Sequence, residues 1–191
     1  MNGALYLDDL TRKQYLQEAQ EITGLENPNS LSQLAVWLRD ETGREINSLT
    51  KDAVADLLSV DLGSDKARRV LNIRQELGKT SNKKYNALEA AVGPDGRVRG
   101  LLQFYGANRT GRWAGRIVQP QNLPRTYIEG EMLTLARDLV KDRNQEGLRL
   151  VYGSVPDTLS QLIRTAFVAK PGCTLVDADF SAIEARMIAW L

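Results

Sequence analysis

The sequence predicts a mainly α-helical protein with a small β component, an α+β fold. Three observations support this prediction. Apolar residues recur at helical spacing through the first 90 residues, two short β-leaning segments follow at 97–105 and 112–118, and helical spacing returns after residue 130. The turn sequence Gly93-Pro-Asp-Gly96 ends the first helical part. We therefore expect one region over 1–95 and a second over 96–191.

Four helical stretches are expected before this turn. The first spans 8–23, ends at Gly24 and carries one apolar stripe, made of Leu10, Tyr15, Leu16, Ala19 and Ile22. Ser30–Gln33 has the spacing of a capping box and should open a second helix, and a shorter helix covers about 50–58. Ser64 is the expected N-cap of a long stretch that reaches about residue 91 and is broken near Gly78.

The second half begins with two extended segments around the loop Gly106–Gly111. Helices are expected at 130–144 and 155–168, the latter capped by Ser154. A strand over 174–179 and a helix over 181–191 complete the prediction.

The composition excludes several chemistries. The chain has no histidine and a single cysteine, Cys173. Catalytic triads that need histidine, zinc sites with histidine ligands and internal disulfides are therefore excluded, and a reducing, cytoplasmic compartment is expected. No apolar run approaches the ~18 residues of a membrane span, and no signal peptide is expected.

The positive charge is concentrated in one stretch. Residues 79–125 have a net charge of +7, because only Glu89 and Asp95 oppose nine basic residues: Lys79, Lys83, Lys84, Arg97, Arg99, Arg109, Arg112, Arg116 and Arg125. Such a block is either a solvated basic face or a surface for a polyanion. The arginines are interleaved with aromatic and amide side chains, which favours nucleic acid: Phe104, Tyr105, Asn108, Trp113, Gln119, Gln121 and Asn122.

Asp177 and Asp179 are the candidate metal ligands. Alternate residues of a strand share a face, so both carboxylates would project the same way at the end of the expected strand. Carboxylates in that position can hold a divalent cation for phosphoryl transfer. The alternative is that Asp179 caps the following helix, and that Ser181 and Glu184 form a capping box. Spacing alone does not choose between the two aspartates.

The chain contains, in this order, LNIRQELGKTSNKKY at 71–85, TGR and QNLPR at 110–125, RTAF at 164–167 and LVDADFSAIEARMIAWL at 175–191. Together these segments resemble family A DNA polymerases, the DNA polymerase I-like group. LVDADFSAIEARMIAWL at 175–191 is similar to that family's first catalytic motif, D-[YF]-S-x-I-E-x-R. TGR at 110–112, followed by QNLPR at 121–125, resembles the T-G-R…Q-N-[IL]-P segment of that family. RTAF at 164–167 resembles the R-x-A-F motif that precedes the catalytic strand. LNIRQELGKTSNKKY at 71–85 resembles the long thumb helix with its lysine-rich end. The sequence of the segment at 109–125 is most similar to that of bacteriophage or prophage members of the family.

The resemblance implies roles for individual residues. Asp179 matches the catalytic, metal-binding aspartate, Phe180 lies beside it at the nucleotide site, and Glu184 matches the glutamate near the sugar of the incoming nucleotide. Arg112 matches an arginine at the primer terminus. The remaining matches are DNA-binding positions: Lys79, Lys83, Lys84, Arg109, Gln121, Asn122 and Arg125. Asp177 receives no role.

The resemblance also implies an architecture and partners. The chain would cover a helical thumb-like region and the first strand and helix of a palm, with an insertion over 125–163. The fingers helix and the second metal-binding carboxylate would lie outside it. The parent would transfer deoxynucleotidyl groups from deoxynucleoside triphosphates onto primer–template DNA with two Mg²⁺, whereas this chain alone would bind DNA without catalysis.

Three other expectations stay open. The chain could be a non-catalytic nucleic-acid-binding product of a truncated prophage gene. It could also be a helical domain whose basic stretch packs on a partner protein. Apolar residues of the last helix, including Ile183, Met187 and Trp190, make self-association plausible.

Overall fold

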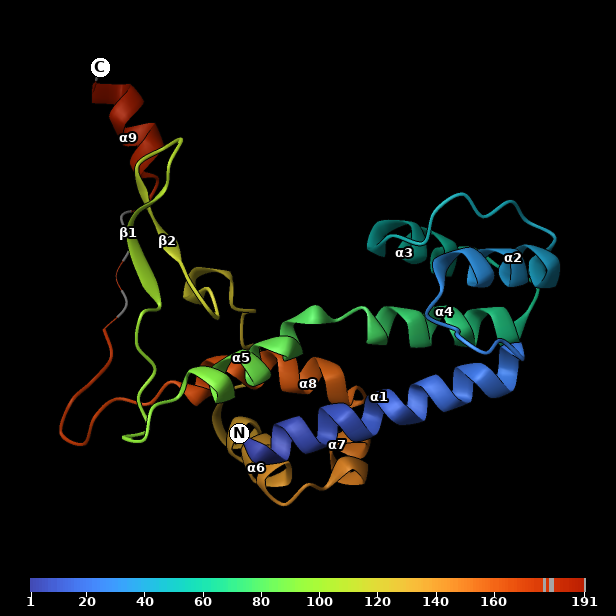
Figure 1. Cartoon of the computed structure of the whole chain (residues 1–191), viewed down its shortest axis with the longest axis horizontal. Helices are drawn as coiled ribbons and strands as arrows, with labels where there is room; N and C mark the ends of the chain where they lie inside the picture. Colours follow the sequence, from blue (N-terminus) through green and yellow to red (C-terminus); the bar gives the residue numbers. More distant parts are fainter. Residues whose placement is uncertain (177, 179–180, 191) are drawn as a thin grey trace.

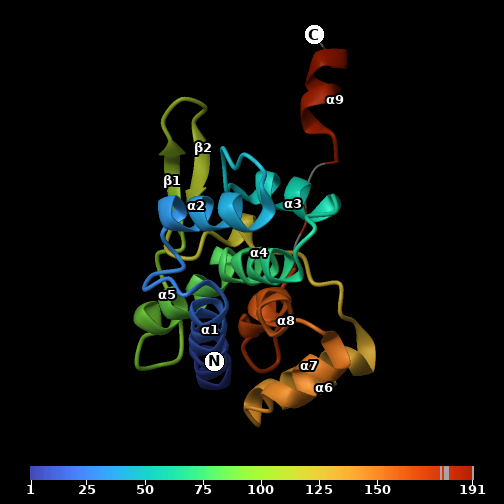
Figure 2. The ribbon, with the colours of Figure 1, turned by 90° about the vertical axis from the view of Figure 1, so that its right-hand side faces the viewer.

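The computed structural model describes residues 1–176, 178 and 181–190, and within them the chain is mainly helical with one two-stranded hairpin. The predicted α+β class is confirmed. Helices α1 (Asn2–Thr23), α4 (Asp65–Leu77) and α8 (Val155–Leu162) form a central layer, which Figure 2 shows nearly end-on. Two arms rise from this layer, one carrying α2 (Leu31–Thr42) and α3 (Lys51–Ser59), the other carrying the hairpin and α9 (Ile183–Trp190) (Figure 1).

The remaining elements complete the layer and connect the arms. A 3-10 turn, η1 (Thr80–Asn82), leads from α4 into α5 (Lys83–Ala91), so the predicted break near Gly78 is confirmed. Strands β1 (Leu102–Ala107) and β2 (Arg112–Gly115) are followed by the 3-10 turn η2 (Pro120–Asn122). Helices α6 (Gly130–Lys141) and α7 (Gln145–Tyr152) precede α8, and the 3-10 turn η3 (Ile163–Ala166) follows it.

Three serines are predicted as N-cap residues, and two of them make the expected side-chain hydrogen bond to the helix backbone. The Ser64 hydroxyl accepts a hydrogen bond from the Ala67 backbone N–H at 3.2 Å, and Ser154 accepts one from Asp157 at 3.1 Å. Ser30 is the N-cap residue of α2, as predicted, but the capping box is not formed, because the Ser30 side-chain hydroxyl makes no cap hydrogen bond. That hydroxyl instead lies 3.2 Å from the Ser32 Oγ, so two neighbouring hydroxyl groups satisfy each other.

Two separate apolar cores hold the helices. The larger core joins α1, α5, α6, α7 and α8 and contains Ala4, Leu7, Tyr85, Leu123, Ala136, Val140, Leu148, Val155, Leu159, Leu162 and Ile163. The smaller core lies under α2 and α3 against α4 and contains Leu34, Leu38, Leu49, Val54, Leu62, Ala67, Val70 and Leu71. The larger core therefore draws residues from both sides of position 95, and the domain division there stays a prediction.

The hairpin is antiparallel and shorter than the sequence predicted. Leu102 pairs with Gly115 and Ala107 with Arg112, with an irregularity between Gln103 and Ala107. The first segment does not begin at residue 97, because Gly100 has a positive φ of 72° that interrupts the extended chain. Val98 makes an isolated bridge with Val92 instead.

The C-terminal third differs most from the sequence prediction. The helix expected over 130–144 ends at Lys141, because Arg143 has a left-handed backbone with φ 56°, and α7 follows as a separate helix. Residues 174–176 and 178 are not in a strand, so the described part of the predicted strand 174–179 is wrong. Strand hydrogen bonds need a neighbouring strand, and in the described ranges β1 and β2 pair only with each other. The final predicted helix is confirmed as α9.

Over the described part of the chain, every helix is too short or too polar to span a lipid bilayer.

Candidate nucleic-acid interface

The exposed face of the hairpin carries three aromatic rings. Phe104 is 71%, Tyr105 57% and Trp113 62% exposed to solvent. The rings of Phe104 and Trp113 meet edge to face with their centroids 5.3 Å apart, and those of Phe104 and Tyr105 are 6.4 Å apart. We call these three residues the aromatic cluster. An apolar cluster of this exposure on a folded chain indicates a binding surface.

Arginines surround the aromatic cluster. Arg109 lies in the hairpin loop, Arg112 begins β2 and Arg116 follows it, and all three are exposed. Arg109 and Arg116 have no carboxylate within ion-pair distance among the residues that the structure describes. The hairpin therefore presents positive charge that a polyanion can neutralise.

Arg112 and Glu184 are brought together although 72 residues separate them. The Arg112 guanidinium donates to Glu184 Oε1 at 2.6 Å, and both side chains are mostly exposed. A pair this exposed contributes about 0–1 kcal/mol, since water screens both charges. The contact is therefore weak enough to be exchanged for a ligand.

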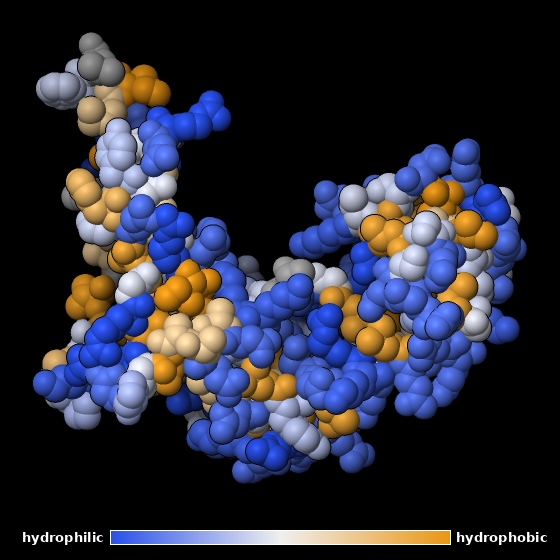
Figure 3. Space-filling model, in the orientation of Figure 1, coloured by the Kyte–Doolittle hydropathy of each residue, from blue (hydrophilic) through white to orange (hydrophobic). Residues whose placement is uncertain are grey.

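A hollow separates the two arms of the molecule (Figure 3). At its base a cavity of about 770 Å³ opens between α3, α4, η1 and α8. Its basic lining residues are Lys51, Arg74, Lys79 and Lys84, and Asn122 and Asp157 also line it. Two predicted DNA-binding lysines and one predicted amide thus face the same space.

Lys84 and Asn122 are in direct contact. The Lys84 ammonium donates to the Asn122 backbone carbonyl at 3.0 Å. Partial burial lowers the pKa of Lys84, and the nearby positive charge of Arg164 lowers it further. Arg164 itself donates to the backbone carbonyls of Leu123 and Pro124 at 3.0 and 2.8 Å. These bonds fix the end of η2 and the residues after it against α5 and η3, a role for Arg164 that no local pattern indicated.

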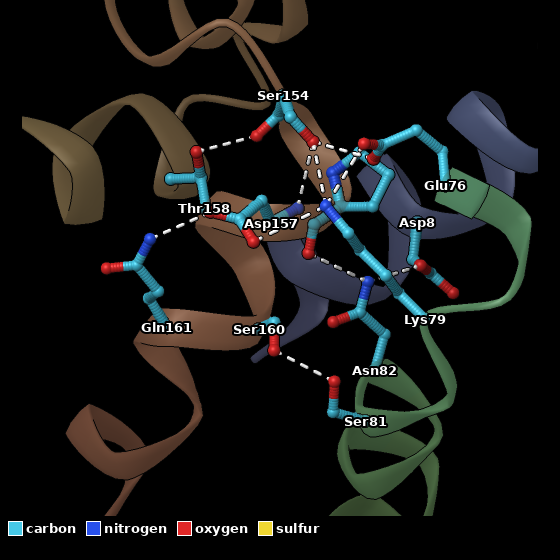
Figure 4. Close-up of polar contacts among 11 residues, drawn as sticks. Asp8, Glu76, Lys79, Ser81, Asn82, Ser154, Asp157, Thr158, Ser160 and Gln161 are labelled. Carbon is cyan, nitrogen blue, oxygen red and sulfur yellow. Dashed lines mark hydrogen bonds and ion pairs between the residues drawn. The ribbon is translucent and has the colours of Figure 1, made fainter. Parts of the chain in front are cut away.

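Lys79 differs from its neighbours because its charge is compensated inside the fold. Its ammonium lies 3.0 Å from Glu76 Oε1, 3.3 Å from Asp157 Oδ1 and 3.5 Å from Ser154 Oγ (Figure 4). Ser154 also donates to Glu76 Oε2 at 2.7 Å. The Lys79 side chain is 25% exposed. Lys83, by contrast, is exposed on the first turn of α5.

The same polar cluster continues into η1 and α1. Asn82 donates to Asp8 Oδ1 at 2.9 Å and to the Pro156 carbonyl at 3.3 Å, and the Ser81 and Ser160 hydroxyls are 2.8 Å apart (Figure 4). Asn82 is buried, and its Oδ1 has no hydrogen-bond partner among the residues that the structure describes. These contacts join three helices at the base of the hollow, so they fix the position of the lysine-rich segment.

Gln121 packs against the base of the hairpin. A Cβ on Gly115 would collide with the Gln121 side-chain amide, so the glycine permits this close approach. The Asn122 amide donates to Gln119 Oε1 at 3.1 Å. Arg125 is exposed two residues after Leu123, which is buried. The predicted DNA-binding residues of 121–125 thus adjoin the hairpin.

Arg99, a further arginine of the basic block, is also paired with a carboxylate. Arg99 donates two hydrogen bonds to Asp95, at 2.6 and 3.0 Å, within the turn that precedes the hairpin. This bidentate contact, helped by the Arg97 backbone N–H, lowers the pKa of Asp95 to about 2. The net charge available to a ligand is therefore smaller than the sequence count suggests.

The predicted metal ligand lies outside the described residues. Asp179, together with Phe180 and Asp177, belongs to the positions that the structure does not describe. Elsewhere in the described chain, no three Cys, Asp or Glu side chains gather in a way that fits a metal ion.

Comparison with known proteins gives one informative match. No protein-family description matches the chain, and no solved structure does. The DNA polymerase of Bacillus phage SP02 is 53% identical over 188 residues, which cover 98% of this chain. The chain spans only 28% of the length of that relative. It is therefore homologous, over nearly its whole length, to a part of a phage DNA polymerase.

Proposed function

We propose that this chain is the primer–template-binding part of a template-directed DNA polymerase of the family A type. The observation that carries the proposal is the 53% identity to a phage DNA polymerase over 98% of the chain. The ordered set of motifs at 71–85, 110–125, 164–167 and 175–191 supports the assignment to family A. In this assignment the helices before residue 95 form the thumb, and the hairpin and α9 belong to the start of the palm.

Duplex DNA would lie against the basic side of the hollow. Lys83, Arg109, Arg116 and Arg125 are exposed and could meet its phosphates, whereas Gln121 and Asn122 adjoin the hairpin base. Phosphate contacts of this kind supply affinity and position with little sequence preference.

Arg112 and Glu184 mark the end of the primer in this proposal. Arg112 would contact the primer terminus and Glu184 the sugar of the incoming deoxynucleoside triphosphate, beside Asp179 and Phe180. DNA binding would then replace the exposed contact between Arg112 and Glu184. Asp179 would hold the Mg²⁺ ions of the parent enzyme together with a carboxylate from the rest of its chain.

The proposal is tested by binding and extension assays on the 191-residue chain. With about five to seven phosphates contacted, the affinity for a labelled primer–template should fall with salt on a log–log slope of roughly −4 to −6. Binding that is absent at low salt, or that does not change with salt, contradicts the proposal. A variant with Arg109, Arg116 and Arg125 changed to alanine should flatten the slope by roughly 2.7.

A matched control removes three exposed charges elsewhere. Lys13, Arg39 and Lys141 are exposed and lie outside the basic block. Their combined replacement by alanine should leave the slope nearly unchanged. The chain alone should extend no primer, because the resemblance places the fingers helix and the second metal-binding carboxylate in the rest of the parent. Primer extension by the purified wild-type chain that is lost in Asp179→Ala would overturn the expectation that this chain alone is inactive.

A further inference from the structure

We propose that the aromatic cluster of the hairpin binds unpaired nucleobases of single-stranded DNA by stacking. The inference rests on the proposed function, since it assumes a nucleic-acid ligand, and it adds a second binding mode to duplex contact. The occupant we assign is single-stranded DNA that continues from the duplex, bound through its base faces and its phosphates.

The exposure of the rings is the first reason. A side chain such as Phe104 or Trp113 is strongly stabilised by burial, and large aromatic side chains are seldom left open to water in a group. Here three rings are each more than half exposed, and all three belong to one hairpin. The cluster is therefore a surface that a ligand with apolar faces would cover.

The backbone of β1 is the second reason. Consecutive residues of a regular strand project to opposite faces of the sheet. The pairing of β1 is irregular between Gln103 and Ala107, and Tyr105 has a left-handed backbone with φ 51°. As a result Phe104 and Tyr105 keep their ring centroids within 6.4 Å of each other, and Trp113 joins from β2. The irregular strand thus gathers rings that a regular one would separate.

The Tyr105 ring is also held in place. It lies over Gly111, where an added Cβ would come within 2.9 Å of the ring. Gly111 has a positive φ of 67°, so the loop conformation itself favours glycine at this position. A ring that is fixed before binding loses little conformational freedom when a base stacks on it.

Charge identifies the class of ligand. Arg109, Arg112 and Arg116 flank the rings, and the segment 97–125 contains no acidic residue. Alternating aromatic and basic side chains are the combination that binds single-stranded nucleic acid, through stacking and phosphate contact. In a duplex the base faces are already stacked on one another, so these rings would find free faces only on unpaired bases.

The test compares two DNA probes on the full 191-residue chain. A short labelled oligothymidylate reports single-strand binding, and a blunt duplex reports the proposed duplex contact. Phe104→Ala and Trp113→Ala should each weaken oligothymidylate binding by roughly five- to 150-fold, the range expected for loss of one base–aromatic stack. Duplex affinity should change by less than about twofold, since phosphate contacts supply it.

Two control variants make the comparison specific. Leu102→Ala removes an exposed aliphatic side chain, 60% exposed on the same strand, and should leave both affinities unchanged. Trp113→Phe keeps a ring and should retain most of the oligothymidylate affinity. Circular dichroism of each variant verifies the fold, which we expect to persist because the hairpin side chains lie outside both cores.

The outcomes separate this inference from the proposed function. Salt-dependent duplex binding with oligothymidylate binding unchanged in Phe104→Ala and Trp113→Ala overturns the inference and leaves the proposed function intact. Loss of all duplex binding by the wild type contradicts the proposed function itself. Concentration-dependent self-association that disappears in Trp113→Ala would also overturn the inference, because the cluster would then be an interface between copies.

Discussion

Replacing Lys79 with alanine should lower the stability of the fold. The Lys79 ammonium contacts Glu76 and Asp157 at 3.0 and 3.3 Å, and its removal leaves these two carboxylates close to each other without a counter-charge. Breaking a fully buried pair costs about 3–5 kcal/mol, and an exposed one costs about 0–1 kcal/mol. The lysine and Glu76 side chains are 25% and 20% exposed, although Asp157 is 50% exposed. We therefore expect an intermediate loss of about 2 kcal/mol.

Urea and thermal unfolding followed by circular dichroism measure this loss. For a chain of this size, about 2 kcal/mol corresponds to a melting temperature lowered by roughly 4–8 °C. Lys83→Ala is the matched control, because Lys83 is only four residues away and exposed. It should change stability by less than about 0.5 kcal/mol and flatten the salt slope of DNA binding by roughly 0.9.

The opposite result would show that Lys79 acts on DNA and not on stability. If Lys79→Ala keeps the wild-type unfolding curve and flattens the salt slope, then Lys79 binds phosphate and its internal contacts contribute nothing measurable. Lys79 would then contact DNA phosphates, as the sequence predicts, in the same way as Lys83.

Four further outcomes are expected. In a polymerase that contains this chain, Arg112→Ala should lower kcat/KM for primer extension by about 2–3 kcal/mol in transition-state free energy and change duplex affinity less, as steady-state kinetics and anisotropy would show. In the same enzyme, Glu184→Ala should lower the kcat/KM ratio of deoxy- to ribonucleotide, and a ratio unchanged within about twofold would remove the sugar-contacting role. Leu159→Ala, at a fully buried position of the larger core, should destabilise the chain by about 2–5 kcal/mol in urea unfolding. Arg99→Ala should return the pKa of Asp95 from about 2 toward 3.8 in a carboxyl NMR titration, because the guanidinium stabilises the charged form; the matching stability contribution is present above pH 3.8 and lost as the pH falls through about 2.

The helices could be predicted from the sequence where a local chemical signal marks their ends. Ser64 and Ser154 each precede an apolar repeat and each makes the expected cap bond, since capping depends on residues only three positions apart. The end of α6 at Lys141 and the separate helix α7 were not predicted, because the break between them depends on the left-handed backbone of Arg143, a residue type that does not favour that conformation. The strand boundaries were also predicted incorrectly, because strand pairing depends on a neighbouring strand that a local sequence pattern does not contain.

The candidate site could be predicted in composition but not in contacts. The excess of arginines and aromatic residues at 97–125 is visible in the sequence, and the structure places part of this set on one exposed hairpin: Phe104, Tyr105, Arg109, Arg112 and Trp113. The pairing of Arg112 with Glu184 and of Lys79 with Asp157 joins residues more than 70 positions apart. Such tertiary contacts decide which charges are available, and a single sequence does not reveal them.

The two apolar cores differ in how the chain builds them, and this difference has an evolutionary consequence. The buried residues of the smaller core all lie within one stretch, 34–71, with Ile22 of α1 packed against them, whereas the larger core draws buried residues from position 4 to position 163. A core built mostly within one stretch can accommodate a substitution by changes at nearby positions of the sequence. Substitutions in α2 and α3 should therefore be matched mainly by changes in α4, whereas a change in the larger core has to be matched at positions throughout the chain.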